Sequence, residues 1–168
     1  ESWMAIPEEA FADEFIYFSQ VEDGVLQTGN FRGSYRSSKV ISFHKHYDRI
    51  EIHQENTRYY FNPDSPLSKA EEANINSPIL ASLNIVGIDS AETTYLISGD
   101  ALFLSEKIAM IKPPSRSGRK SALGKLSKDK TKITEFNNYP ENLEVTVDDD
   151  FAVSCKFEVQ NIGDISGL

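Results

Sequence analysis

The sequence predicts an α+β fold that is predominantly antiparallel β, with one to three helices and a bent or sandwich-like sheet. Residues 39–55 alternate apolar and polar side chains on both sides of a turn, which is typical of a β-hairpin. From Leu143 to Val159 the apolar residues recur at odd positions, so a single face is apolar over the whole stretch. Tyr and Phe, which strands favour, number 7 and 10.

Length and composition indicate one globular domain. The chain has 168 residues, 39% hydrophobic and 26% charged, which is enough to bury a core. A net charge of −9 argues against binding a nucleic-acid backbone over a large surface, because such binding needs a basic face. The sequence also lacks a run of about 18 apolar residues, so it predicts no membrane span.

The N-terminal half divides into a leader and the first strands. Residues 1–13 are expected to form a leader that packs through its apolar side chains, and residues 14–160 a single β-rich domain. Residues 14–21 predict a strand that is apolar on both faces, so both faces are expected to be covered. Residues 22–38 are rich in Gly and Ser and predict a loop, which leads into the hairpin with its turn at 46–48.

Helical signals lie in the middle of the chain. Residues 65–76 predict a helix, with Pro66 at its first position. Residues 79–89 are compatible with either a helix or a strand, and periodicity does not decide between them. A strand over 93–98 is followed by a helix over 99–111 with Asp100 as its N-cap.

A basic loop follows at residues 112–132. Its eight Lys and Arg residues stand against the single acid Asp129. The favoured interpretation is a solvated, mobile loop, and the alternative is a docking surface for an acidic partner. The residues that would bind such a partner are Arg116, Arg119, Lys120, Lys125 and Lys128.

Three aspartates interrupt the C-terminal apolar pattern. Either one long bent strand or two strands joined by a bulge near Asp148, Asp149 and Asp150 accounts for the preserved parity. A bulge would turn Asp149 away from the core and avoid the cost of burying its charge. The only cysteine, Cys155, rules out an internal disulfide and is expected to be a buried, unreactive thiol.

The candidate metal ligands are His44, His46 and His53, which lie on the predicted hairpin. A zinc site there would also need a carboxylate such as Asp48 or Glu51. The favoured interpretation is that these histidines are ordinary polar residues on the solvent-facing side of the hairpin. HExxH, paired Cys motifs, Gly-rich phosphate loops and GxSxG are all missing, so no catalytic residue is predicted.

Several segments, in order, resemble a known family. "PPSRSG" followed by "TEFNNYPENLEV" resembles the signature of an N-terminal domain of unknown function in bacterial zinc-dependent metallopeptidases. "VISFHKHYDRIEIHQENTRYYF" is similar to that domain's hairpin, and "AEEANINSPILASLNIVGID" to its helix and the segment after it. The resemblance runs from about Phe15 to Phe151. Two departures are Asp149, where the family has an apolar strand residue, and the insert "RKSALGKLSKDK".

The resemblance implies a function for the chain. In such proteins a metzincin-like HExxH domain follows, so residues 161–168 are expected to be a linker towards that peptidase domain. Zinc would be bound in the parent protein and no cofactor in this chain. The implied role is a noncatalytic accessory domain that packs on the peptidase domain and helps to bind peptide substrate. The implied location is the periplasm or the cell surface.

Two alternatives remain open at this point. One is a cell-surface adhesion module that uses the basic loop 112–132 to bind acidic glycans or proteins. The other is a purely structural scaffold that helps the peptidase domain to fold.

Overall fold

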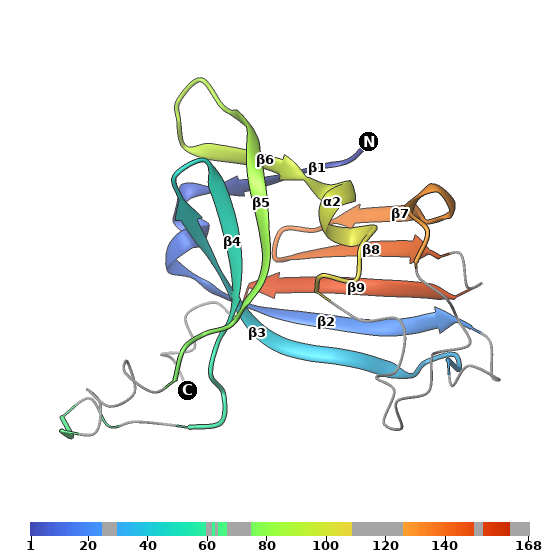
Figure 1. The fold of residues 1–168 in the computed structure, drawn as a ribbon, viewed down its shortest axis with the longest axis horizontal. Helices are drawn as coiled ribbons and strands as arrows, with labels where there is room; N and C mark the ends of the chain where they lie inside the picture. The colour runs from blue at the N-terminus through green and yellow to red at the C-terminus, as the bar shows by residue number, and fades with distance from the viewer. Residues whose placement is uncertain are drawn as a thin grey trace.

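The computed structural model describes residues 1–24, 30–59, 62, 64–66, 75–108, 126–149 and 153–161. Nine strands form one antiparallel sheet in the order β1-β6-β5-β4-β3-β2-β9-β8-β7 (Figure 1). The strands are β1 Trp3–Pro7, β2 Glu14–Asp23, β3 Tyr35–His46, β4 Arg49–Gln54, β5 Ile79–Ile88, β6 Thr94–Ser98, β7 Lys132–Asn138, β8 Asn142–Asp148 and β9 Ser154–Asn161. The predicted antiparallel sheet is therefore confirmed.

Helix is scarce in the described residues, and its content is lower than predicted. It consists of α2 (Gly99–Phe103) and two short 3-10 turns, η1 (Glu8–Ala12) and η3 (Lys128–Lys130). Most of the helix predicted over 65–76 falls outside the described residues. None of the described helices is long and apolar enough to cross a membrane.

The helix predicted over 99–111 is much shorter, and its predicted cap is wrong. Ser98 is the N-cap, because its hydroxyl accepts a hydrogen bond from the Ala101 N–H at 3.1 Å. The hydroxyl of Ser105 shares its one proton between the carbonyls of Ala101 and Leu102, at 3.1 and 3.0 Å. Those two carbonyls would accept the bonds of a continuing helix, so the side chain competes with further turns.

The hairpin predicted over 39–55 is confirmed as β3 and β4. Phe43 pairs with Ile52, and both side chains are buried, as are the neighbouring Ile41 and Ile50. The turn lies where it was predicted, since His46 pairs directly with Arg49. The segment 79–89, which was compatible with helix or strand, is strand β5.

Two strands curl the sheet into a half-barrel. The first part of β3 pairs with β2 and its last part with β4, so one continuous strand belongs to both halves of the sheet. Likewise β5 pairs with β4 up to Asn84 and with β6 from Ile85 onward, and the β5–β6 ladder has a register shift between Ile85 and Gly87. Such irregularities increase the local twist and bend of a strand. In Figure 1 β4 and β5 accordingly cross the direction of β2, β9, β8 and β7.

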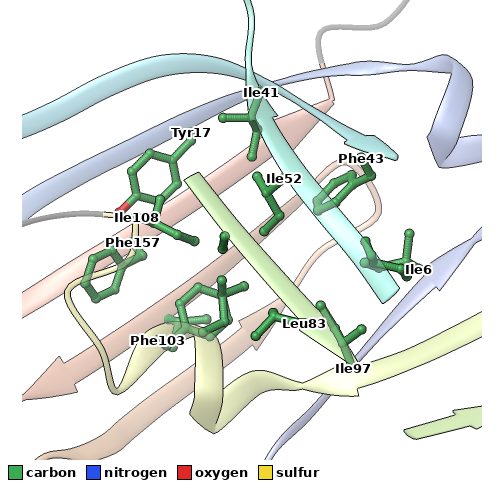
Figure 2. Close-up of a cluster of buried hydrophobic side chains, with 14 of the residues drawn as sticks. Ile6, Tyr17, Ile41, Phe43, Ile52, Leu83, Ile97, Phe103, Ile108 and Phe157 are labelled. Carbon is green, nitrogen blue, oxygen red and sulfur yellow. The ribbon is translucent and has the colours of Figure 1, made fainter. Parts of the chain in front are cut away.

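The core fills the concave side of this curl. Figure 2 shows side chains from strands on both halves converging there, with Phe103 of α2 and Ile108 beside Phe157 of β9. The rings of Phe103 and Phe157 are 6.0 Å apart. On β2, Tyr17 is fully buried, whereas Ile16 on the convex face is 39% exposed. The prediction that both faces of 14–21 are covered is therefore wrong, because a single curled sheet covers only its inner face.

Residues 1–13, expected to be a leader, contribute a strand of the sheet. β1 pairs with β6 in a regular register from Trp3 to Pro7. Ile6 and Ala10 are buried in the core. The ring of Phe11 lies 5.6 Å from that of Tyr95 on β6. The segment thus forms one edge of the sheet.

The C-terminal apolar stretch is a hairpin, and both predicted alternatives for it are wrong. β8 pairs with β9, with Val145 opposite Phe157 and Val147 opposite Cys155. The loop from Asp149 to Val153 has an odd number of residues, and an odd loop keeps directly paired residues at the same parity. Asp149 is buried instead of turned outward, and its Oδ1 accepts the Val153 N–H at 3.1 Å.

Candidate functional site

The three histidines do not meet at one point. The rings of His44 and His53 lie 4.3 Å apart on the convex face of β3 and β4. His46 lies at the end of β3, with its ring 4.7 Å from that of Tyr47. Among the described residues no group of three or more His, Cys, Asp or Glu side chains is arranged to hold a metal ion.

The hydrogen bonds of these histidines identify which groups donate. The Ser42 hydroxyl donates to Oε1 of Glu55 and also lies 2.9 Å from Nε2 of His44. Because that hydroxyl has a single proton, which it donates to Glu55, a hydrogen bond to His44 requires the tautomer that carries the ring proton on Nε2. A serine is activated as a nucleophile by an imidazole that accepts its proton. In this arrangement the Ser42 proton is directed to Glu55 and not to His44.

His53 is held in a similar way. Its Nε2 lies 3.2 Å from Oε2 of Glu51, on the neighbouring position of the same face. These contacts satisfy polar side chains on a strand surface. The basic residues singled out in the loop, Arg116, Arg119, Lys120 and Lys125, lie outside the described residues, as does the side chain of Lys128.

A different place in the fold offers a binding site. β1 and β7 are the two ends of the sheet, and no strand among the described residues pairs with the outer edge of either. The curl brings these edges to the same side of the molecule, next to α2 (Figure 1). Residues 1–7 and 131–138 bound the space between them, which we call the seam.

Two cavities occupy the seam. One, of about 660 Å³, lies between residues 3–7 and the β7–β8 turn. The other, of about 580 Å³, lies between residues 1–3 and residues 131–136. Both volumes are within the range of ordinary ligand sites. Trp3 from β1 and Phe136 from β7 line both cavities, so the two cavities are neighbours along the seam.

The main chain of β1 presents hydrogen-bonding groups to the seam. Towards β6, the Ser2 carbonyl accepts the Gly99 N–H, and the Glu8 N–H donates to the Thr93 carbonyl. In an antiparallel ladder, alternate residues direct both main-chain groups to the same neighbour. Even-numbered residues of β1 therefore face β6, and odd-numbered residues face the seam. Its edge includes the N–H and C=O of Trp3 and Ala5.

The same argument applies to β7. The Tyr139 N–H donates to the Asn142 carbonyl at 2.8 Å, across the turn to β8. Phe136 and Asn138 lie at the other parity of this ladder, after the bulge between Ile133 and Glu135. Their N–H and C=O groups consequently point towards the seam. Each edge thus offers an incoming chain at least two residues whose main-chain groups face away from the strands that the structure describes.

Apolar and acidic side chains surround these edges. Trp3 is 46% exposed and Phe136 is 44% exposed, although Phe136 pairs with the fully buried Val145 on the core side of the sheet. Phe136 therefore extends the core surface to an uncovered edge. At the first cavity, Glu9 and Glu141 add carboxylates.

A further carboxylate lies at the second cavity. Asp100 accepts hydrogen bonds from the Ser2 hydroxyl at 2.6 Å and from the Ser2 N–H at 2.9 Å. The Ser2 hydroxyl is the main cause that lowers the pKa of this carboxyl. The charge on Asp100 therefore anchors the first residues of the chain beside α2, where they form one end of the seam.

The sequence analysis missed this site. Residues 131–138 include Asn137 and Asn138, which stand next to a turn that contains Pro140. This composition is typical of a loop, although the segment forms strand β7. One signal of the site was available in the sequence. Trp3, the chain's only tryptophan, begins a short apolar segment near the N-terminus. The location of the seam depends on strand order, and a local pattern does not contain that order.

Comparison with protein-family models places most of the chain in a single family. Residues 33–162, more than half of the 168-residue chain, match the model of a domain of unknown function, DUF5117. This range includes β3 to β9 and leaves out β1 and β2. Searches of curated proteins and of solved structures found no significant match. On the strength of the family match, the chain belongs to the DUF5117 family of domains of unknown function.

Proposed function

We propose that this chain is a noncatalytic accessory domain that binds an extended polypeptide segment in the seam. The observation that carries the proposal is that β1 and β7, whose outer edges pair with no described strand, border two neighbouring cavities that Trp3 and Phe136 both line. A strand edge binds an extended chain through main-chain hydrogen bonds, so it tolerates many sequences. That property suits a domain which presents substrate segments to a separate catalytic centre.

The parent protein in this proposal is an exported zinc-dependent metallopeptidase, with the zinc bound in a domain that follows this one. The resemblance of "SRSG" and "YPENLEV" to the signature of such proteins supports this part. The test is the reading frame downstream of Leu168. An HExxH motif in a domain that follows supports the proposed parent, and a frame without a catalytic domain removes it.

Binding to the seam has an internal reporter. Trp3 is the only tryptophan, and it lines both cavities. Adding a reduced and alkylated, unfolded polypeptide without tryptophan should therefore shift the tryptophan emission of the chain to the blue, as the bound polypeptide covers part of the indole. An emission spectrum that stays unchanged at saturating polypeptide would remove the proposed function.

A matched pair of variants tests the main-chain contacts. Ala5→Pro removes an N–H that faces the seam, and an edge strand tolerates proline at such a position. Ala5→Ser keeps the N–H and serves as the control. The proposal expects weaker binding for the proline variant, an unchanged affinity for the serine variant, and similar melting temperatures for both.

Hydrolysis assays test the noncatalytic part of the proposal. The chain is incubated with an unfolded polypeptide and added zinc, with and without a chelator, together with the variants His44→Ala and His46→Ala. We expect no cleavage under any of these conditions. Cleavage that is lost both with the chelator and in a histidine variant would make the chain itself a peptidase.

A further inference from the structure

The two edges of the seam run in the same direction. The sheet has nine strands, and each neighbouring pair is antiparallel, so strand direction alternates from β1 to β7. With an odd number of strands, the first and the last point the same way. The cavities agree with this, because residues 1–3 lie opposite 131–133, and residues 4–7 lie opposite the turn after β7.

We propose that the seam takes one polypeptide strand that runs antiparallel to both β1 and β7 and thereby closes the sheet with a tenth strand. This inference rests on the proposed function and specifies how the segment is bound. One strand in this orientation extends the antiparallel ladder on both of its sides. Alternate residues of the bound strand pair with Trp3 and Ala5 of β1, and the residues between them pair with Phe136 and Asn138 of β7. Closure also removes both open edges at once.

The side chains beside the seam select the composition of the bound strand. On the core side of the sheet, β1 carries Met4 and Ile6, and β7 carries Ile133 and Phe136. Inward-facing residues of the bound strand would contact these four apolar side chains, and outward-facing residues would meet water. Because side chains alternate between the two faces of a strand, apolar residues are expected at every second position.

Charge selects the direction. The first cavity, at the ends of β1 and β7, is lined by three carboxylates, those of Glu9, Asp13 and Glu141, and no Lys, Arg or His is among the described residues that line it. The second cavity, at the other end, is lined by Glu1 and Asp100 but also by Lys132, so it is the less acidic of the two. An antiparallel strand has its N-terminal end at the first cavity. We therefore expect Lys or Arg at the first positions of the bound segment, followed by alternating apolar residues. The free amino group of a peptide would be favoured there for the same reason.

Two synthetic peptides of the same composition test the direction. Each has about eight residues, the length of an ordinary strand, with alternating Val and Thr. One carries two lysines at its N-terminal end and the other carries them at its C-terminal end. Exposed charge contacts are weak, so we expect the first peptide to bind about fivefold more tightly at low salt, with a smaller difference at high salt.

Paramagnetic labels and hydrogen exchange locate the bound strand. A spin label on the peptide's N-terminus should broaden the amide signals of Glu9 and Glu141, and a label on its C-terminus those of Lys132. Peptide binding should slow hydrogen exchange at Ala5 and at Asn138 together.

The outcomes separate the two proposals. Protection of one edge only, equal affinities at low salt, or reversed broadening would overturn the tenth-strand inference while peptide binding itself stands. If neither peptide binds, both proposals fail. Light scattering over a series of protein concentrations measures whether the chain dimerises. A dimer that forms without any peptide binding would likewise overturn both proposals and assign the seam to a second copy of the chain.

Discussion

Oδ1 of Asp149 accepts the main-chain N–H of Val153 at 3.1 Å, and the Asp149 N–H donates to the Val153 carbonyl at 3.0 Å. The two residues thus close the loop between β8 and β9 from both directions. Asp149 is only 7% exposed, so water has little access to the Val153 N–H beside it. The carboxylate stabilises the folded state because it accepts the hydrogen bond of that N–H.

Asp149→Ala is therefore expected to lower the free energy of unfolding by about 1–3 kcal/mol, because it leaves the buried Val153 N–H without its side-chain acceptor. Asp149→Asn should lower it less, since the amide oxygen can still accept that bond. Asp148→Asn is the control, because Asp148 is partly exposed and lies 4.0 Å from Lys132 in a surface pair. Urea unfolding measures all three, and equal losses for Asp148→Asn and Asp149→Ala would contradict this role.

The same loop shows why the C-terminal hairpin was not predicted. Leu143 to Val147 and Cys155 to Val159 keep one parity, which predicts one long bent strand or two strands joined by a bulge. A hairpin keeps that parity whenever its loop has an odd number of residues, as from Asp149 to Val153. Parity alone therefore does not separate a strand from a hairpin. The three aspartates were the better signal, because Asp accepts hydrogen bonds from nearby main-chain groups in turns.

Local patterns predicted what local physics decides. The β3–β4 hairpin follows from the alternation around Ile41 and Ile50, and its turn was placed correctly. The helix predicted over 99–111 ends at Phe103, because the Ser105 side chain bonds to carbonyls that a longer helix would use. The seam depends on which strands lie at the ends of the sheet, and that arrangement is set by pairing between segments distant in the sequence.

The burial of Ile6 tests whether the N-terminal segment belongs to the core. Ile6 is 2% exposed on β1, so Ile6→Ala should lower the free energy of unfolding by about 2–5 kcal/mol. Ile16→Ala makes the same change on the convex face of β2 and should cost less than half as much, because that side chain already contacts water. Denaturant titrations compare the two. A similar cost for both would mean that β1 contributes little to folding.

Cys155 predicts a loss of stability at high pH. Burial, and then the charge of Asp149, raises the pKa of its thiol from 9.0 to about 12. The unfolded chain therefore loses this proton first. The stabilising contribution is complete below pH 9.0 and is lost as the pH rises towards about 12.

The measurement is the free energy of unfolding at increasing pH for the parent and for Cys155→Ala. The unmutated chain should lose stability more steeply than Cys155→Ala above pH 9.0. The difference between the two pH profiles separates the effect of the thiol from that of other groups that titrate in this range. Parallel pH profiles would contradict the assignment. The native thiol should also resist iodoacetamide at about pH 8, since the thiolate is the reactive form.

Phe136 separates binding from stability. Its ring extends the core surface to the edge of β7 but is 44% exposed, so Phe136→Ala should reduce peptide affinity severalfold and change the melting temperature little. Phe31→Ala is the matched control, because Phe31 is also exposed but does not line either cavity. It should leave affinity unchanged. If both variants weaken binding equally, the polypeptide contacts apolar surface in general and the seam is not its site.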